Sequence, residues 1–231
     1  PGMGKTAFCL ALAKNAAVDY NRPVAFFSLE MSALQLTHRL MSMVAEIPGS
    51  KLRNAQMEDY EWQQLNSAVE RFSEVPIFID DTPAINIFEL RAKCRRLKMH
   101  HDIQLVIVDY LQLMSAGPEG KRGGTREQEI STISRALKTM AKELEVPILL
   151  LSQLNRAPEM RCDRTPQLSD LRGSGALEQD SDNVFFLHHL QDEDYDGKKG
   201  TTIDVVLTIA KQRSGISGKN NIMRFFTACL L

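Results

Sequence analysis

Short apolar runs recur along the chain, and segments with helical spacing separate several of them. The runs cover residues 24–29, 76–79, 105–108, 147–151, 184–187, 203–209 and 222–227. Continuous apolar runs of this length are typical of strands in a sheet that is covered on both faces. Strands alternating with helices predict an α/β fold with a mainly parallel sheet. Short turns join the last runs, so we expect these strands to be antiparallel and to extend one edge.

Helices are predicted where a capping residue precedes apolar residues spaced three and four apart. Three pairs have capping spacing: Ser32 with Gln35, Asn86 with Glu89, and Thr125 with Gln128. One buried stripe follows the last pair, made of Ile130, Ile133, Leu137, Met140 and Leu144. A further helix carries Trp62, Leu65, Val69 and Phe72 on one face, and we expect these four side chains to lie in the core.

Composition narrows the class of protein. The 231 residues are 43% hydrophobic, enough for one large domain with a sizeable core, and the net charge of −1 excludes a global attraction to nucleic acid. No apolar run reaches the length of a membrane span, so we expect a cytoplasmic protein with no membrane partner. The four cysteines are scattered without a C-x-x-C pair, which predicts free thiols in a reducing compartment.

The chain begins with PGMGKT, directly before a helix-forming run. This matches the end of the pattern G-x-x-x-x-G-K-[ST], whose backbone N–H groups cradle nucleotide phosphates. The residues predicted to bind the nucleotide here are Gly2, Met3, Gly4, Lys5, Thr6 and Ala7. The first glycine of the pattern would precede Pro1, so we expect the sequence to start inside this loop. A simple glycine turn before a helix is the alternative interpretation.

Polar residues close several of the predicted strands. Asp109 follows the strand 105–108, where its carboxylate can bind the Mg²⁺ shell of a nucleotide. Glu30 closes the first strand and can polarise a water, or it can merely favour the start of the next helix. Ser152 and Gln153 close the strand 147–151, where an amide can sense a terminal phosphate. Because strand ends of a parallel sheet share one edge, we expect these side chains to converge.

Several segments together resemble one family of proteins. They are PGMGKT, FFSLEM, VIVDYLQLM, LLSQLNR, SDLRGSGALEQDSD and KQRSG, in the family's order and across almost the whole chain. The combination resembles the C-terminal RecA-like motor domain of the DnaB replicative helicases, hexameric P-loop NTPases. The resemblance implies that residues 1–231 form one such domain, truncated at its N-terminus inside the Walker A loop. It also implies that the N-terminal collar domain and linker of these helicases are absent.

The resemblance implies roles for individual residues at an ATP site. Lys5 would bind phosphate, Thr6 and Asp109 would hold Mg²⁺, Glu30 would be the general base, and Gln153 would sense the γ-phosphate. Two further residues, Lys211 and Arg213, match the pair that such helicases project into the neighbouring subunit's site. Arg213 would be an arginine finger in trans, and a plain surface cation is the alternative.

The resemblance also implies contacts with single-stranded DNA, mainly to backbone phosphates. Arg172, Gly173 and Gly175 align with the segment that grips phosphates, and Lys121, Arg122 and Arg126 are looser candidates. The family usually has an acid where this chain has Gly173, so the affinity or loop geometry is expected to differ. The basic helix residues Arg91, Lys93, Arg95, Arg96 and Lys98 spread around their helix, which favours a solvated or subunit-facing surface over a DNA patch.

The sequence therefore predicts a replicative helicase motor in which Mg²⁺ and ATP are used between the subunits of a homo-hexameric ring. Single-stranded DNA, a primase and a helicase loader are the expected partners. Another RecA-type recombination ATPase is one alternative, and a non-catalytic remnant that binds DNA or docks the loader is another. The strand expected before the Walker A loop is central in related domains. Without it we expect unpaired backbone groups, low stability or self-association.

Overall fold

The computed structural model describes residues 3–117, 125–154, 165–171, 175–189, 202–215 and 217–226. The α-helices are α1 (Lys5–Lys14), α2 (Ala33–Ala45), α3 (Gly49–Asn54), α4 (Asp59–Ser73), α5 (Ile87–His101), α6 (Arg126–Leu144) and α7 (Gly175–Asp180). The strands are β1 (Val24–Ser28), β2 (Ile77–Asp80), β3 (Leu105–Asp109), β4 (Ile148–Leu150), β5 (Asn183–His189), β6 (Thr202–Gln212) and β7 (Lys219–Phe226). A π-helical turn, Asn15–Asp19, continues α1, and short 3-10 turns span Leu111–Leu113 and Leu168–Leu171.

The first four strands form a parallel sheet in the order β2-β1-β3-β4. Each predicted apolar run is present as a strand, with ends shifted by a few residues. The order places β3 beside β1, so Ser28 pairs with Asp109 at the carboxyl edge. The parallel α/β architecture predicted from the alternation of strands and helices is confirmed.

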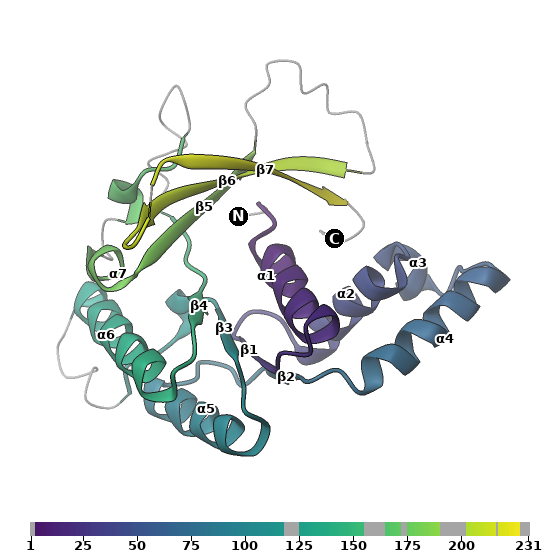
Figure 1. Cartoon of the computed structure of the whole chain (residues 1–231), viewed down its shortest axis with the longest axis horizontal. Coiled ribbons are helices and arrows are strands. Elements are labelled where there is room, and N and C mark those ends of the chain that lie inside the picture. The colour runs from purple at the N-terminus through teal and green to yellow at the C-terminus, as the bar shows by residue number, and fades with distance from the viewer. Residues whose placement is uncertain are drawn as a thin grey trace.

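Helices cover both faces of this sheet, as the continuous apolar strands predict. Alternate residues of β1 point to opposite faces: Ala25 and Phe27 pack in the core formed with α5 and α6, and Val24 and Phe26 pack in the core formed with α1 and α2. The ribbon diagram shows α1 and α2 on one side of the strands and α5 and α6 on the other (Figure 1). Burial on both faces is why β1 carries no polar alternation.

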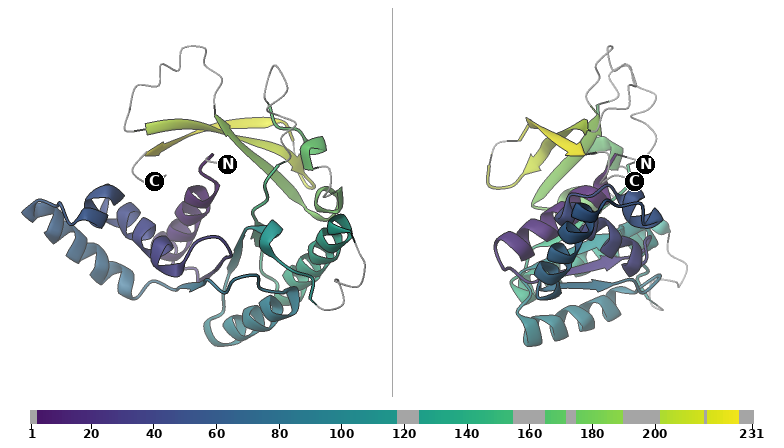
Figure 2. Two further views of the ribbon diagram at one scale, coloured as in Figure 1. Left: turned by 180° about the vertical axis from the view of Figure 1, so that it is seen from behind. Right: turned by 90° about the vertical axis from the view of Figure 1, so that its right-hand side faces the viewer.

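The last three strands pair antiparallel in the order β5-β6-β7, as predicted for the C-terminal runs. Among the described residues they form a sheet of their own, and no ladder joins β5 to β4. This second sheet arches over the start of α1 in views from the front and from behind (Figures 1 and 2). A cavity of about 1550 Å³ separates the two sheets, and residues of α1, β4, α6 and β5 line it.

The predicted helix caps are present. Ser32 and Thr125 each accept a hydrogen bond from the backbone N–H three residues on, within a complete capping box. Asn86 accepts from the N–H groups of Phe88 and Glu89, both at 3.0 Å. All members of the predicted α6 stripe are buried. These caps could be predicted from the sequence because each capping contact lies within one turn of the chain.

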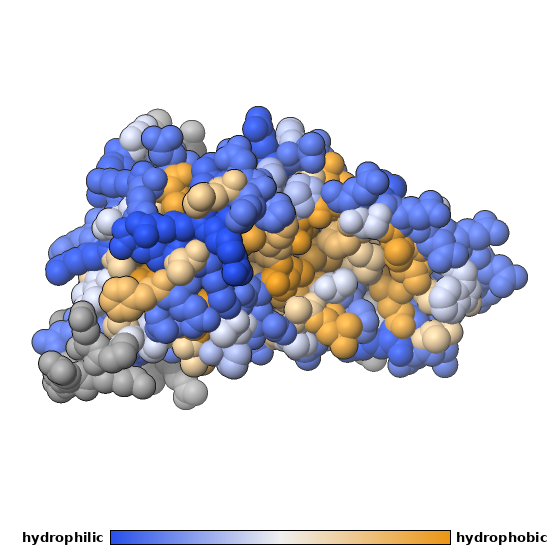
Figure 3. Space-filling view, turned by 90° about the horizontal axis from the view of Figure 1, so that it is seen from below, coloured by the Kyte–Doolittle hydropathy of each residue, from blue (hydrophilic) through white to orange (hydrophobic). Residues whose placement is uncertain are grey.

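The prediction that the α4 stripe lies wholly in the core is wrong for two of its residues. Trp62 and Val69 expose 43% and 49% of their surface, whereas Ala68 is 3% exposed and packs with Leu65 beside α2 and α3. The apolar face of α4 is thus rotated relative to the stripe assumed from spacing. Viewed from below, apolar side chains gather over the middle of the molecule and reach toward the side of α2 to α4 (Figure 3). Within the described residues no helix has both the length and the apolar character needed to cross a bilayer.

Candidate nucleotide-binding site

The glycine loop ends where α1 begins. Gly4 caps α1 with a φ of 76°, a left-handed conformation in which a side chain would be strained. The Gly4 carbonyl accepts the first hydrogen bond of the helix, from the Phe8 N–H at 2.8 Å. By helix geometry the N–H groups of the first turn have no acceptor within the helix, and the dipole adds positive potential there. This end of α1 is suited to an anion; Gly2 lies outside the described residues.

The tip of α1 meets the tip of β3. The Thr6 hydroxyl donates to Asp109 Oδ2 at 2.6 Å across 103 positions of sequence. Asp109 is 2% exposed, and Ser28 of the neighbouring strand is 1% exposed. A carboxylate at this depth is costly unless a partner is close, and the hydroxyl supplies one. The contact joins two residues that the sequence assigned to the same site.

Charged groups around Asp109 influence one another. Burial raises the pKa of Asp109; the hydrogen bond from Thr6 counters the rise, Glu30 adds to it, and Lys5 and Arg39 counter it. Burial also lowers the pKa of the Lys5 ammonium, while Asp109 and Glu30 raise it. Lys5, Glu30 and Asp109 are therefore close enough to interact, as their placement at strand and helix ends predicts.

Glu30 lies just beyond β1 with its side chain exposed. The Leu29 N–H donates to the Asp109 carbonyl at 2.6 Å, which ties the end of β1 to the end of β3. Ser32 then starts α2. Glu30 is thus held between two fixed points, with its carboxylate directed to solvent near the Asp109 side of the sheet.

Gln153 follows β4 and is exposed. Together with Lys5 and Met3 it lines the cavity between the sheets. The backbone of Gln153 is bound to Gln112: the Gln153 N–H donates to Gln112 Oε1 at 3.4 Å. Glu30 and Lys5 both shift the pKa of Asp109, whereas within the described residues Gln153 is connected to this group only by lining the same cavity as Lys5.

Two residues of this region were missed from the sequence. Arg39 on α2 is half-buried, and burial lowers the pKa of its guanidinium while Asp109 and Glu30 raise it. The only available signal was that α2 directly follows the first strand. The local pattern of residues does not show which face of that helix lies against the sheet edge. Gln112 lies inside the quoted VIVDYLQLM segment, where an amide shortly after a strand-end acid was the available signal.

Lys211 lies at the end of the long strand β6 of the antiparallel sheet, and Arg213 directly follows that strand. The Lys211 ammonium donates to the carbonyls of Glu178 and Ser181 at 2.5 and 2.9 Å, at the carboxyl end of α7. Arg213 forms an ion pair with Asp182 at 3.1 Å, and its side chain remains 55% exposed. Among the described residues, no hydrogen bond or ion pair joins Lys211 or Arg213 to Thr6 or Asp109.

The predicted DNA contacts fall mostly outside the described residues, namely Lys121, Arg122, Arg172 and Gly173. Gly175 begins α7, and nothing lies within 4 Å of where its Cβ would be, so packing does not require glycine there. Arg126 begins α6 and binds the chain after β3 through its guanidinium. Among the described residues no group of three or more His, Cys, Asp or Glu side chains is placed to hold a metal ion.

The basic helix α5 makes ion pairs within the chain. Arg91 and Arg95 both pair with Glu143 of α6, and Lys93 pairs with Asp80 at 2.7 Å. These pairs link α5 to its neighbours. These contacts test no partner, so a solvated or subunit-facing surface over a DNA patch stays a prediction.

Comparisons with known proteins agree with this geometry. The family model described as the DnaB-like helicase C terminal domain matches residues 1–228. The chain is 43% identical over 215 residues to the replicative DNA helicase DnaB of Leifsonia xyli subsp. xyli, covering 93% of this chain and 46% of the relative. It is 44% identical over 218 residues to the replicative DNA helicase DnaC of Bacillus subtilis (strain 168), covering 94% and 47%. The chain thus spans about half the length of these curated relatives.

Solved structures show the same likeness. One described as an ATPase domain superposes with a TM-score of 0.86 at 36% identity, covering all of this chain and 80% of that one. A DnaB-like replicative helicase, studied with its interactions with primase, gives a TM-score of 0.82 at 37% identity, covering 97% of this chain and 52% of the other.

Proposed function

The chain belongs to the DnaB-like helicase C-terminal domain family, and from that premise we propose that it is the ATP-hydrolysing motor of a replicative DNA helicase. Its RecA-like α/β fold supports the proposal, because a parallel sheet with a glycine loop before α1 is suited to nucleotide binding.

The observation that carries the proposal is the hydrogen bond from Thr6 to Asp109 at 2.6 Å. It brings the hydroxyl of the glycine-loop helix and the acid of β3 together at one edge of the sheet, with Lys5 beside them. Coupling of these groups is what phosphoryl transfer in P-loop proteins needs. A structural helix cap would not require a buried carboxylate at the end of a distant strand.

The Thr6 hydroxyl and the Asp109 carboxylate fit Mg²⁺, which prefers oxygen ligands. When bound, Mg²⁺ would offset the negative charge of the phosphates. Burial raises the pKa of Asp109 because it disfavours the charged carboxylate, and a bound cation would stabilise that charge. Thr6 and Asp109 are the residues proposed to hold it.

The remaining residues act on the phosphates and on water. Lys5, partly desolvated, binds the β- and γ-oxygens of ATP, and the N–H groups at the start of α1 bind the phosphates. Glu30 accepts a proton from the attacking water as general base. Gln153, at the end of β4, contacts the γ-phosphate and responds to its loss.

A homo-hexameric ring is part of the proposal. Arg213 is 55% exposed on the chain that carries it, which leaves its guanidinium accessible to a neighbouring subunit. In a ring it would reach the adjoining ATP site and stabilise charge in the transition state, while Lys211 anchors the end of β6 to α7.

Single-stranded DNA is the proposed track. Arg172, Gly173 and Gly175, with Lys121, Arg122 and Arg126 as looser candidates, are proposed to contact its phosphates. A primase is a proposed partner, consistent with the solved DnaB-like helicase studied with primase. A helicase loader and a cytoplasmic location complete the proposal.

Steady-state ATP turnover with and without single-stranded DNA tests the proposal. We expect DNA-stimulated turnover that is abolished by EDTA and restored by Mg²⁺. Asp109→Asn should lose that Mg²⁺ dependence together with at least about a hundredfold in turnover, as expected for a metal-site ligand of phosphoryl transfer. Absence of any turnover in the assembled protein would favour the non-catalytic remnant, which the family match does not favour. Strand exchange without unwinding would favour a recombination ATPase.

A further inference from the structure

Gln112 lies in the 3-10 turn Leu111–Leu113 shortly after β3, and its side chain is hydrogen-bonded to the residues that follow β4. Its Nε2 donates to Ser152 Oγ at 2.9 Å and to the Gln153 carbonyl at 3.3 Å, and its Oε1 accepts from the Gln153 N–H at 3.4 Å. Both ends of one amide are therefore used by Ser152 and Gln153. Donor and acceptor must both stay aligned, so this side chain follows any movement of the backbone that carries Gln153.

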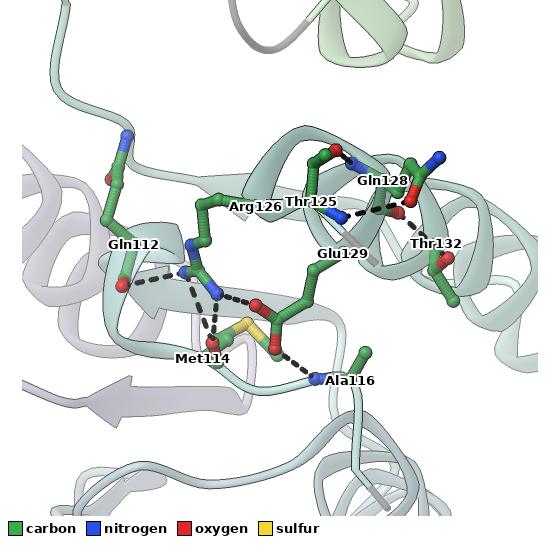
Figure 4. A network of polar contacts seen from close by, with 8 residues as sticks. All are labelled: Gln112, Met114, Ala116, Thr125, Arg126, Gln128, Glu129 and Thr132. Atoms are coloured by element: carbon green, nitrogen blue, oxygen red, sulfur yellow. Dashed lines mark hydrogen bonds and ion pairs between the residues drawn. The ribbon is translucent and has the colours of Figure 1, made fainter. Parts of the chain in front are cut away.

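The backbone of the same residue is bound to α6. The Gln112 carbonyl accepts from the Arg126 guanidinium at 2.8 Å, and the Met114 carbonyl accepts from it at 3.3 Å (Figure 4). Arg126 also pairs with Glu129, whose carboxylate accepts from the Ala116 N–H at 3.0 Å. Arg126 is the first residue of α6 and therefore fastens the start of that helix to the turn after β3.

The start of α6 is itself rigid. The Thr125 side chain accepts from the Gln128 N–H, and the Gln128 side chain accepts from the Thr125 N–H at 3.0 Å (Figure 4). A capped first turn moves as a unit. A displacement delivered to Arg126 is thus transferred to the whole first turn of α6.

We propose that Gln112 is a positioning residue that joins the end of β4 to the start of α6 through Arg126. Its side-chain amide moves with the Gln153 backbone, and its backbone carbonyl transmits that movement through Arg126 to α6. This rests on the proposed function, in which Gln153 responds to the γ-phosphate. Lys121 and Arg122, proposed to contact DNA, precede α6 in the chain, so the link runs from the phosphate end of β4 toward the element that follows the DNA-contacting segment.

Gln112→Ala tests the link through coupling. We measure, for each variant, the ratio of ATP turnover with and without an oligo-deoxythymidine strand, and the ratio of that strand's Kd with ADP to its Kd with a non-hydrolysable ATP analogue. Loss of a coupling contact should bring both ratios down roughly tenfold toward one. The KM for ATP without DNA should change by less than about threefold, because no hydrogen bond joins Gln112 to the described part of the glycine loop.

Two variants frame that result. Gln104→Ala is the matched control, because within the described residues the Gln104 amide donates only to Asp102, in the turn after α5; both ratios should keep their original values. Gln112→Glu keeps the shape and the acceptor but loses the donor to Ser152 and Gln153, so it should fail to restore either ratio. Unchanged ratios in Gln112→Ala, or full restoration in Gln112→Glu, would overturn the proposal.

Amide hydrogen exchange tests the link without ATP turnover. Arg126→Ala touches neither Ser152 nor Gln153, yet it releases the Gln112 carbonyl. Exchange at the Gln153 N–H should therefore rise by about fivefold or more, along with exchange at the start of α6. A rise confined to α6 would overturn the link itself. A wild-type protein whose turnover never responds to DNA would contradict the proposed function and the coupling role, while the exchange result still decides whether the connection exists.

Discussion

The nucleotide site and the tip of the antiparallel sheet hold their charged groups in opposite ways. At the first, Thr6 donates to a carboxylate that is 2% exposed, and burial shifts the pKa values of Asp109 and Lys5. At the second, the Arg213 side chain is 55% exposed and pairs with Asp182, an acid whose pKa its pairing with Lys138 lowers. The buried carboxylate of the first region has its hydrogen-bond partner within the chain, whereas the arginine of the second region is largely exposed to solvent.

The difference has a physical origin in topology. Parallel strands end at a common edge, so polar residues that close them gather and lose water together. The end of β6 belongs to a separate sheet, where the carbonyls of Glu178 and Ser181 hold Lys211 while the Arg213 side chain stays 55% exposed. We propose that the buried pair binds a ligand in the chain's own site and that the exposed arginine acts on a neighbouring subunit.

Removing the outward arginine should have the largest effect. Arg213→Ala is expected to lower ATP turnover by about a thousandfold or more, the range for an arginine finger, with nucleotide binding retained. The reason is the loss of charge stabilisation at the neighbouring site. Turnover of the mutant ring with saturating ATP measures it.

Mixed rings supply the decisive control for Arg213. Lys5→Ala subunits, inactive at their own site, still carry Arg213 and should restore turnover at the sites of Arg213→Ala neighbours. Arg95→Ala, which removes an arginine of similar exposure on α5, should leave turnover unchanged. A ring in which mixing restores nothing would place Arg213 outside any neighbouring site.

Removing the proposed base at the inner group should have the next largest effect. Glu30→Gln keeps the shape of the side chain but cannot accept a proton, so hydrolysis should fall by about a hundredfold to ten-thousandfold. ATP binding, followed by a fluorescent nucleotide analogue, should remain. Glu127→Gln, which changes another exposed acid, in the first turn of α6, is the matched control. If Glu30→Gln still hydrolysed ATP at the original rate, the base would be another group.

A smaller effect is expected at the proposed DNA contact. Arg172→Ala should reduce the slope of log Kd for single-stranded DNA against log salt by about one unit, because one phosphate contact releases about one counterion. Titrations at several salt concentrations measure the slope. Arg71→Ala, in the last turn of α4, should leave the slope as it is. The same slope in both variants would place Arg172 away from the DNA.

The smallest effect concerns a helix cap away from both charged groups. Asn86→Ala removes the acceptor for the N–H groups of Phe88 and Glu89, which should lower the free energy of unfolding by about 1 kcal/mol. Urea unfolding measures it. Asn66→Ala, on the exposed part of α4, should change stability by less than about 0.5 kcal/mol. Equal losses would show that the α5 cap contributes nothing of its own.

Much of the fold and the nucleotide site could be predicted because the signals are local or periodic. The apolar runs became strands, and the Ser32, Asn86 and Thr125 caps formed as their spacing indicates. The α4 stripe failed at Trp62 and Val69, since spacing gives the period of a helix but leaves open which arc of it meets a neighbour. The roles assigned to Glu30, Gln153 and Arg213 remain predictions.

The sequence alone determined the class of the protein: a glycine loop before a helix, acids at strand ends, and family segments in order need no coordinates to be recognised. Tertiary structure decided which of these groups touch. The bond from Thr6 to Asp109 and the bridge from Gln153 through Gln112 to Arg126 both join residues far apart in the chain. Strand order and helix rotation set such distances, and these depend on packing across the whole sheet, which no local pattern of residues encodes.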